Sequence, residues 1–505
     1  MSENKKKTIL SVRERWGPKP LHERTSPSLE ANSSRLERID RIHCLGYMNW
    51  ISTSWAMMFI KQGIVPAKDA SEVARVVLEL WEYPGKPEEL AAAHTYGIDC
   101  YFNRVLGDEV GGRLMMARTQ PSSRQMLQVR HQLMKQICRI HDLQEAILNL
   151  AEQHADTIMP GYTHFRHAQP TTFGHYLLSV SDAIGRSTKT LEDGYHLMSL
   201  NEMGCGALAG TSWPIDRDLV SSYMGMEGLI ENTNDAVCYT DGYLVIVSGL
   251  VNVTNVTSRI ALDLSYWSGV EYGFLDIGGR RGTSFMMPQK EGNPNSMEFV
   301  RTRAGQMLGH LSGVAAAGLR APHGDVFEML YIDEPTLAAL KTAEKCTTEL
   351  TNEMRGITVH KERMLDLIRE SYISATELAN QLVRDCEIGY RTAHDIVNDF
   401  VLTSQERKIP ATEASLELFD EAAQKALGRK LGISEARLRE LLDPAYFIKV
   451  TNSRGGIAPE EVARMIADRR QQLAEARDRH LKRIESLENA QKRMVADLQG
   501  AMALV

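Results

Sequence analysis

A long amphipathic segment near the middle of the chain limits the possible folds more than any other feature of this sequence. Between residues 126 and 150 the apolar positions advance in steps of three and four, the spacing of one helix face. These positions are Met126, Val129, Leu133, Ile137, Ile140, Leu143, Ile147 and Leu150. Three more long segments that are poor in proline follow at about 173–200, 241–268 and 296–318. Several long helices without strand patterns between them predict an all-α fold with a central bundle of nearly parallel helices.

Shorter segments on both sides of this bundle predict two further parts of the subunit. Proline and glycine interrupt the first region at WGPKP, VPAKD and YPGKPEE, and the last region at RKIPATEAS, LDPAYF and NSRGGIAPEE. We therefore predict an N-terminal helical domain at 1–115, a central long-helix bundle at 116–364 and a C-terminal helical domain at 365–505. From Pro459 onward a charged stretch has a sparse apolar stripe, which predicts an extended terminal helix that packs along a neighbouring surface.

Composition excludes several classes of partner. The net charge is -7 and the basic residues are scattered along the 505 residues, so nucleic acid is not an expected partner. The seven cysteines include no CxxC pair, which indicates reduced thiols rather than disulfides or a metal site. The charged N-terminus has no signal-peptide core, and polar residues interrupt the most apolar segment, 243–262. We expect a cytoplasmic protein without a membrane span.

The long break in helical pattern at 278–299, GGRRGTSFMMPQKEGNPNSMEF, is the strongest candidate for a functional loop. Glycines at both ends of the loop allow it to close over a ligand and reopen. The loop contains Ser284, Lys290 and Asn293, and the sequence NSME at 295–298 fits a capping box that begins a helix. A cation and amide donors beside a helix N-terminus favour an anionic substrate that bears carboxylates or phosphates.

This loop resembles the signature loop of the fumarase/aspartase superfamily, and other stretches resemble its argininosuccinate lyase branch. The loop match is SFMMPQKEGNPNSMEFVR at 284–301. The branch is indicated by TIMPGYTHFRHAQPTTFGHYLLS at 157–179, GCGALAGTSWPIDR at 204–217, NTNDAV at 232–237, SATELANQLVR at 374–384 and GGIAPEEV at 455–462. The similarity covers about residues 40–475.

The resemblance implies a carbon–nitrogen lyase that reversibly releases fumarate and an amine from an N-substituted, argininosuccinate-like aspartate. Such an enzyme uses neither a cofactor nor a metal. In the family, a serine six residues before the lysine is the base, a position that Ser284 occupies. Removing a proton next to a carboxylate creates a dianionic aci-carboxylate, and stabilising that charge is most of the catalysis. Lys290 and Asn293 match the residues that do so.

Other matched residues are implied to bind the dicarboxylate substrate. Thr163 and His164 match the pair that surrounds the scissile bond, and Glu298 matches the carboxylate that orients such a histidine. Gln169 matches a substrate-side amide. The group that protonates the leaving amine is left open. The resemblance also implies that the bundles of four subunits form the helical core of a homotetramer, whose active sites are shared between subunits.

The sequence departs from the family where the leaving group is held. The first motif keeps Arg118 and Thr119, but Gln120, Pro121 and Ser122 replace the Arg, Asn and Asp of the family pattern. We count Arg118, Thr119 and Gln120 as candidate substrate-binding residues. These changes alter the substrate contacts, so the amine is left unidentified.

Further departures lie in two other loops. In LRAPHGDVFEM at 319–329, His323, Asp325 and Glu328 stand where the family usually has a tyrosine and a glutamine, and His323 is a candidate substrate contact. In the signature loop, Phe285 replaces a second serine and Gly292 is an extra residue. Two alternatives stay open: a true argininosuccinate lyase that uses arginine, and a catalytically silent crystallin-like relative. Retention of the elimination residues argues against the second.

Overall fold

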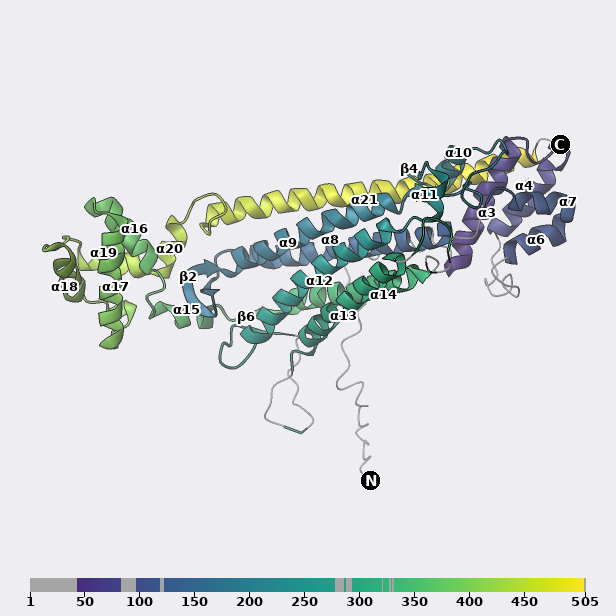
Figure 1. The fold of residues 1–505 in the computed structure, drawn as a ribbon. Helices are drawn as coiled ribbons and strands as arrows, with labels where there is room; N and C mark the ends of the chain where they lie inside the picture. Colours follow the sequence, from purple (N-terminus) through teal and green to yellow (C-terminus); the bar gives the residue numbers. More distant parts are fainter. Residues whose placement is uncertain are drawn as a thin grey trace, which may run out of the picture.

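The computed structural model describes residues 43–82, 97–118, 122–277, 286–287, 293–319, 321–326, 328 and 331–503, and it is mainly helical (Figure 1). The first half of the described chain contains α3 His43–Lys61, α4 Ala67–Glu82, α6 Gly97–Leu106, α7 Asp108–Gly111, η2 Gly112–Met115, α8 Ser122–Gln153, β1 Ile158–Thr163, β2 Arg166–Thr172, α9 Phe173–Leu197, β3 Leu200–Asn201, α10 Arg217–Tyr223, β4 Gly228–Leu229, α11 Thr233–Val237 and α12 Asp241–Trp267. The second half contains β5 Leu275–Asp276, α13 Asn295–Leu319, α14 Asp333–Gly356, β6 Thr358–Val359, α15 Lys361–Arg369, α16 Ala375–Cys386, α17 Tyr390–Glu406, η4 Ala411–Glu413, α18 Leu416–Leu427, α19 Glu435–Leu442, α20 Pro444–Val450 and α21 Pro459–Met502.

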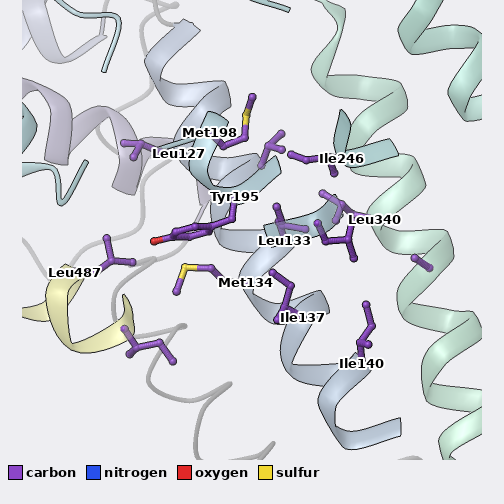
Figure 2. Packing of buried hydrophobic residues seen from close by; sticks show 14 of the residues in the cluster. Leu127, Leu133, Met134, Ile137, Ile140, Tyr195, Met198, Ile246, Leu340 and Leu487 are labelled. Carbon is purple, nitrogen blue, oxygen red and sulfur yellow. The ribbon is translucent and has the colours of Figure 1, made fainter. Parts of the chain in front are cut away.

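Five long helices, α8, α9, α12, α13 and α14, lie side by side and form the predicted central bundle. All eight apolar positions that predicted α8 are buried. Figure 2 shows part of this packing, in which α8 side chains face Tyr195 of α9, Met198 directly after α9, Ile246 of α12 and Leu340 of α14. The predicted all-α fold is therefore confirmed, and α14 is a core helix that the sequence patterns did not single out.

Glycines bring α9 and α12 into close contact at two points. A Cβ atom on Gly194 of α9 would lie 2.6 Å from Ile246 Cγ1 of α12. A Cβ atom on Gly249 of α12 would lie 2.7 Å from Leu191 Cδ2 of α9. Each helix thus places a large side chain over a glycine of the other helix, so the two axes can approach closely.

Helix α12 is long and apolar enough to cross a membrane by length and composition, with a mean hydropathy of 1.4 in its most apolar window. Half of that window is buried inside the protein. The helix packs against α9, α13 and α14. This packing is that of a core helix, as the polar interruptions of the segment indicated.

The terminal helix α21 spans 44 residues and follows the bundle along its length (Figure 1). At 1.5 Å per residue it is about 66 Å long. It contacts α8 and α9 of the bundle and reaches α3, α4 and α10 beyond it. The predicted apolar stripe is buried at Val462, Ile466, Leu473, Ile484, Leu487, Met494 and Leu498. The predicted terminal helix is confirmed, and the surface that it covers belongs to its own chain.

The buried residues form one large core and a separate smaller one. The helices α3, α4 and α6 contribute to the same core as the bundle and α21. Helices α16 to α19 enclose a second core around Leu378, Phe400, Phe419 and Leu438. The division at 115 and 364 stays a prediction, because the N-terminal helices and the bundle share buried side chains.

Short strands occur where the sequence predicted none. In the described part of the chain, β1 pairs with β2 and β5 with β6, both antiparallel, and β3 pairs with β4 in parallel. The β1–β2 hairpin contains Pro160 and Pro170 opposite each other. Proline argues against a strand because it has no N–H to donate, which explains why the hairpin was missed.

Candidate active site

A strained two-residue turn presents Thr163 and His164 at one end of the bundle. Strands β1 and β2 are joined by His164 and Phe165, and Thr163 pairs with Arg166 across the turn. Both turn residues have positive φ, 52° for His164 and 59° for Phe165. Turns of this kind favour Asn and Gly, and bulky residues in this region cost about 1–3 kcal/mol each. The surrounding structure therefore has to hold this tip in place, and Phe165 is 81% exposed on it.

The hairpin below the tip is fixed by a close backbone contact and by the C-terminal helices. A Cβ atom on Gly161 would lie 2.6 Å from the carbonyl oxygen of Gln169, at the point where the strand register shifts. The Gln169 side-chain amide donates to Thr376 Oγ1 of α16 at 3.2 Å. His175 Nε2 in the first turn of α9 lies 3.0 Å from the Gly455 carbonyl oxygen. The tip is thus connected to two distant parts of the chain.

Burial also affects the tyrosine that precedes Thr163. The ring of Tyr162 packs edge-on against His167 and Tyr272, with centroid distances of 5.2 and 6.2 Å. Burial raises the pKa of Tyr162 to about 12, so its hydroxyl stays protonated at neutral pH. This aromatic contact supports the strand that ends at the tip.

The strand β5, which precedes the signature loop in sequence, lies at the same end of the bundle as the hairpin. It pairs with β6, and Asp276 Oδ2 of β5 lies 3.2 Å from His360 Nε2, directly after β6. Ser284 and Lys290 lie outside the described residues, as do Thr119 and Gln120. Their predicted roles stay predictions.

Asn293 and Glu298 lie at the start of α13, where both are exposed. Asn293 precedes the helix by two residues and Glu298 lies in its first turn. The N-terminus of a helix carries a partial positive charge, so this position favours an anion. The structure thus keeps these two predicted residues on one local element, as the sequence implied.

The predicted capping box at 295–298 is wrong. Helix α13 begins at Asn295, and the Glu298 amide donates to the Pro294 carbonyl at 3.1 Å, which places the cap one residue earlier. Ser296 Oγ instead donates to Glu353 Oε1 of α14 at 2.8 Å. The start of α13 is therefore fixed by a neighbouring helix, which the local pattern could not reveal.

Arg118 and His323 lie at the opposite end of the bundle. Arg118 precedes α8 and its Nη1 donates to Ser52 Oγ of α3 at 3.2 Å. His323 follows α13, and its Nδ1 lies 3.4 Å from Cys238 Sγ, just before α12. The hairpin follows the other end of α8, whose 32 residues span about 48 Å. Within one chain, the predicted site residues therefore form two groups at opposite ends of the bundle.

Acidic side chains are exposed near His323. Asp325 and Glu328 are both exposed, and the Asp325 charge contributes to a raised pKa at Cys205, although burial and Glu202 contribute more. Burial also raises the pKa of Cys238, so its thiol stays neutral. Two exposed carboxylates therefore follow an exposed imidazole within five residues of the sequence, a composition that favours a cationic group.

Arg217 organises this second end, and sequence reasoning did not include it among the site residues. It donates to backbone carbonyls of Met203 at 2.7 Å, Ile230 at 2.8 Å and Glu231 at 3.0 Å. Its guanidinium thereby joins Met203, just before the 204–217 segment, to residues 230 and 231, just before the 232–237 segment, and burial lowers its pKa. Its presence in a matched motif was the available signal.

Comparisons with known proteins agree on one family. A family model described as lyase matches residues 123–309, and one described as argininosuccinate lyase C-terminal matches 372–449. The argininosuccinate lyase of Methanocaldococcus jannaschii is 30% identical over 437 residues, or 85% of this chain and 88% of that protein. The argininosuccinate lyase of Methanococcus vannielii is 32% identical over 367 residues, or 72% of this chain and 75% of that protein.

The fold comparison identifies a solved enzyme with the same architecture. The structure of an EDDS lyase variant with bound fumarate has a TM-score of 0.81 to this chain. The two are 28% identical, and the match covers 95% of this chain and 96% of the other.

Proposed function

The chain belongs to the argininosuccinate lyase family, and we propose that it catalyses the reversible β-elimination of fumarate from an N-substituted aspartate. It is a carbon–nitrogen lyase. The observation that most directly supports the proposed reaction is the strained turn at His164 and Phe165. This turn lies within the segment that the lyase family model matches. Strain of this kind persists where a side chain has to be held in one position.

The elimination begins with removal of a proton next to a substrate carboxylate. Ser284 is the base, and the dianionic aci-carboxylate that forms is stabilised by Lys290 and Asn293. The position of Asn293 just before the 25-residue helix α13 supports this role, since the positive end of a helix favours developing negative charge. No cofactor or metal takes part in this scheme.

Thr163 and His164 bind the carboxylate and surround the scissile bond, and Glu298 orients the histidine. Gln169 contributes a substrate-side amide, and its contact with Thr376 supports a fixed position for it. Arg118, Thr119, Gln120 and His323 contact the leaving half of the substrate.

Each active site combines residues from different copies of the chain. The separation of the two groups by about 48 Å, the length of the 32-residue α8, supports this arrangement. The outward side of α12 and α13 also exposes large apolar residues, which in a solvated monomer would be unfavourable. These residues are Leu244, Tyr266, Phe299, Leu308 and Leu319. A homotetramer would bury this surface in a shared helical core.

The assembly is tested by light scattering together with an activity assay. Wild-type protein should have a mass near four times 56.6 kDa. Leu308, 58% exposed in one chain, is the point to disrupt, and Leu308→Glu should give smaller species without activity. A monomer with full activity would contradict the shared site.

The leaving amine carries a positive charge and differs from arginine. The exposed carboxylates of Asp325 and Glu328 support this choice, as does the replacement of the family Arg, Asn and Asp by Gln120, Pro121 and Ser122. The alternative is a true argininosuccinate lyase, which the 30% identity to the Methanocaldococcus jannaschii enzyme favours.

The enzyme acts in the cytoplasm on a small dicarboxylate and binds neither nucleic acid nor membrane. The five cysteines whose side chains are described are free thiols, which supports a reducing compartment.

The reaction is tested by following fumarate absorbance while the enzyme is incubated with fumarate and a panel of amines. Fumarate should disappear with at least one amine, and His164→Asn should slow this loss strongly. If no amine in a broad panel consumes fumarate, the catalytically silent alternative is favoured instead.

A further inference from the structure

Two buried carboxylates lie at the end of the bundle that holds Arg118 and His323. Glu202 directly follows β3, and Asp333 is the first residue of α14. Burial raises the pKa of Tyr243 in the first turn of α12, and the charges of Glu202 and Asp333 contribute to this rise. The end of β3 and the starts of α12 and α14 therefore come together at this point.

Each of the two carboxylates holds a side chain in the first turn of α8. Ser123 Oγ donates a hydrogen bond of 2.8 Å to Glu202 Oε1, and both residues are buried. Such a bond to a carboxylate is stronger than one between neutral groups. Burial raises the pKa of Asp333, and the Arg124 charge and a side-chain hydrogen bond from Gln125 oppose this rise. The first turn of α8 is therefore fixed by two other elements of the bundle.

Glu202 itself is held in place through its own backbone. Arg217 donates to the flanking carbonyl oxygens of Met203 at 2.7 Å and Asn201 at 3.4 Å. The Met203 amide donates to Asn201 Oδ1 at 2.9 Å, which fixes the intervening backbone. The side chain of Glu202 therefore extends from a rigid base, and Ser123 is held against a partner that cannot move freely.

The start of α8 lies close in sequence to a candidate contact of the leaving half of the substrate. Arg118 stands five residues before Ser123, and its Nη1 donates to Ser52 Oγ of α3 at 3.2 Å. A shift in the first turn of α8 would move one end of this short connection. It would thereby change where the guanidinium of Arg118 can lie.

We propose that Glu202 is a positioning residue for the leaving half of the site, because its hydrogen bond with Ser123 sets the place of the α8 start and, with it, that of Arg118. This role rests on the proposed function, which assigns Arg118 to the leaving half. Glu202 acts through Ser123 and does not contact the substrate. Its loss therefore weakens binding of the amine, whereas fumarate at the hairpin end is unaffected.

The role is tested by measuring the KM for the amine and the KM for fumarate with the full-length protein in the amination direction. Glu202→Leu and Ser123→Ala should each raise the amine KM by about tenfold or more, because each removes a buried hydrogen bond to a charged acceptor. The fumarate KM should stay as in wild type. The double variant should show less than the sum of the two effects, because both changes remove the same contact.

Two further variants separate positioning from charge and from a general loss of stability. Glu202→Gln keeps an acceptor for Ser123 without the charge, so it should raise the amine KM much less than Glu202→Leu. Thr347→Val is the matched control, since it removes another buried side-chain hydrogen bond of α8, the one that Gln136 donates at 3.3 Å. It should leave both KM values unchanged even if the Tm falls. The proposal is overturned if Glu202→Leu leaves the amine KM unchanged, or if Glu202→Gln raises it as much as Glu202→Leu.

Amide hydrogen exchange provides a measurement that does not depend on turnover. Glu202→Leu should speed exchange in a peptide that covers residues 122–130 and leave exchange in the hairpin at 158–172 unchanged. If wild type consumes fumarate with no amine, the proposed function fails, and exchange alone then decides whether Glu202 fixes the start of α8. Unchanged exchange at 122–130 overturns the proposal whether or not the enzyme is active.

Discussion

The two ends of the helix bundle hold different halves of the proposed site, and they are built differently. At one end a hairpin fixes Thr163 and His164 on a strained turn, with Gly161 in close backbone contact beneath them. At the other end Arg118 contacts Ser52 of α3, and His323 lies in an exposed stretch of loop and contacts Cys238. The first end keeps the residues that the family motif assigns to the elimination, although Phe285 and Gly292 depart from the motif there, whereas the second end has lost several of the motif residues.

This difference follows from what each end has to recognise. Every reaction of the proposed type involves fumarate and an aci-carboxylate. The residues at the first end therefore have to keep the same positions whichever amine is released. The amine varies from one enzyme to another, and only binding energy constrains the residues that hold it. A change in substrate therefore requires changes at the second end alone.

The largest effect is expected from Ser284→Ala. Loss of the proposed base should lower kcat by about 10²- to 10⁴-fold with little change in KM. Fumarate release measured by absorbance tests this, and Ser179→Ala, an exposed serine of α9, is the control. An active Ser284→Ala enzyme would show that Ser284 is not the base, and the first end would then lack its proposed catalytic group.

The helices of this protein could be predicted because the apolar spacing of a buried helix face is visible in a short stretch of sequence. The stripe of α8 and that of α21 are both buried at every position that the spacing indicated. The hairpin could not be predicted in this way, since its strands contain Pro160 and Pro170 and its turn contains a phenylalanine at positive φ. Only the surrounding contacts, such as that between Gln169 and Thr376, make this conformation favourable.

The candidate site residues could be named from motifs, but their positions relative to one another could not. Thr163 and Arg118 are 45 positions apart in sequence, and nothing in the motifs shows that α8 places them at opposite ends. Arg217 was missed as an organising residue because its partners are backbone carbonyls, which leave no pattern in side-chain identity.

Gly161→Ala should have the next largest effect. A Cβ atom 2.6 Å from the Gln169 carbonyl oxygen forces the strands apart and moves the turn. A shift of about 1 Å in a catalytic group costs about 10²-fold in rate, so kcat/KM should fall by that order. Gly500→Ala, where a Cβ atom would meet open space, is the control and should retain activity. Normal activity in Gly161→Ala would show that the rigidity of the hairpin is not needed.

A smaller effect is expected from the choice of amine. Each lost charge-assisted contact to the leaving half removes about 1.5–3 kcal/mol, so arginine should be worse than the preferred amine by about tenfold to a few hundredfold in kcat/KM. The assay follows fumarate loss with arginine, simple diamines and amino acids at equal concentrations. If arginine is the best amine by a wide margin, other residues compensate for the changes at residues 120–122. The second end would then recognise the same leaving group as the family does.

The smallest effect is expected from His323→Leu, which tests the second end directly. The contact of His323 Nδ1 with the neutral thiol of Cys238, at 3.4 Å, leaves Nε2 as the ring nitrogen that faces away from this partner. One neutral hydrogen bond contributes about 0.5–1.5 kcal/mol, so the KM for the amine should rise by about twofold to tenfold. The KM for fumarate should not change, because the proposed function assigns fumarate to the hairpin end of another copy. A rise in the fumarate KM would place His323 with the other half of the site, and the assignment of separate roles to the two ends would then be wrong.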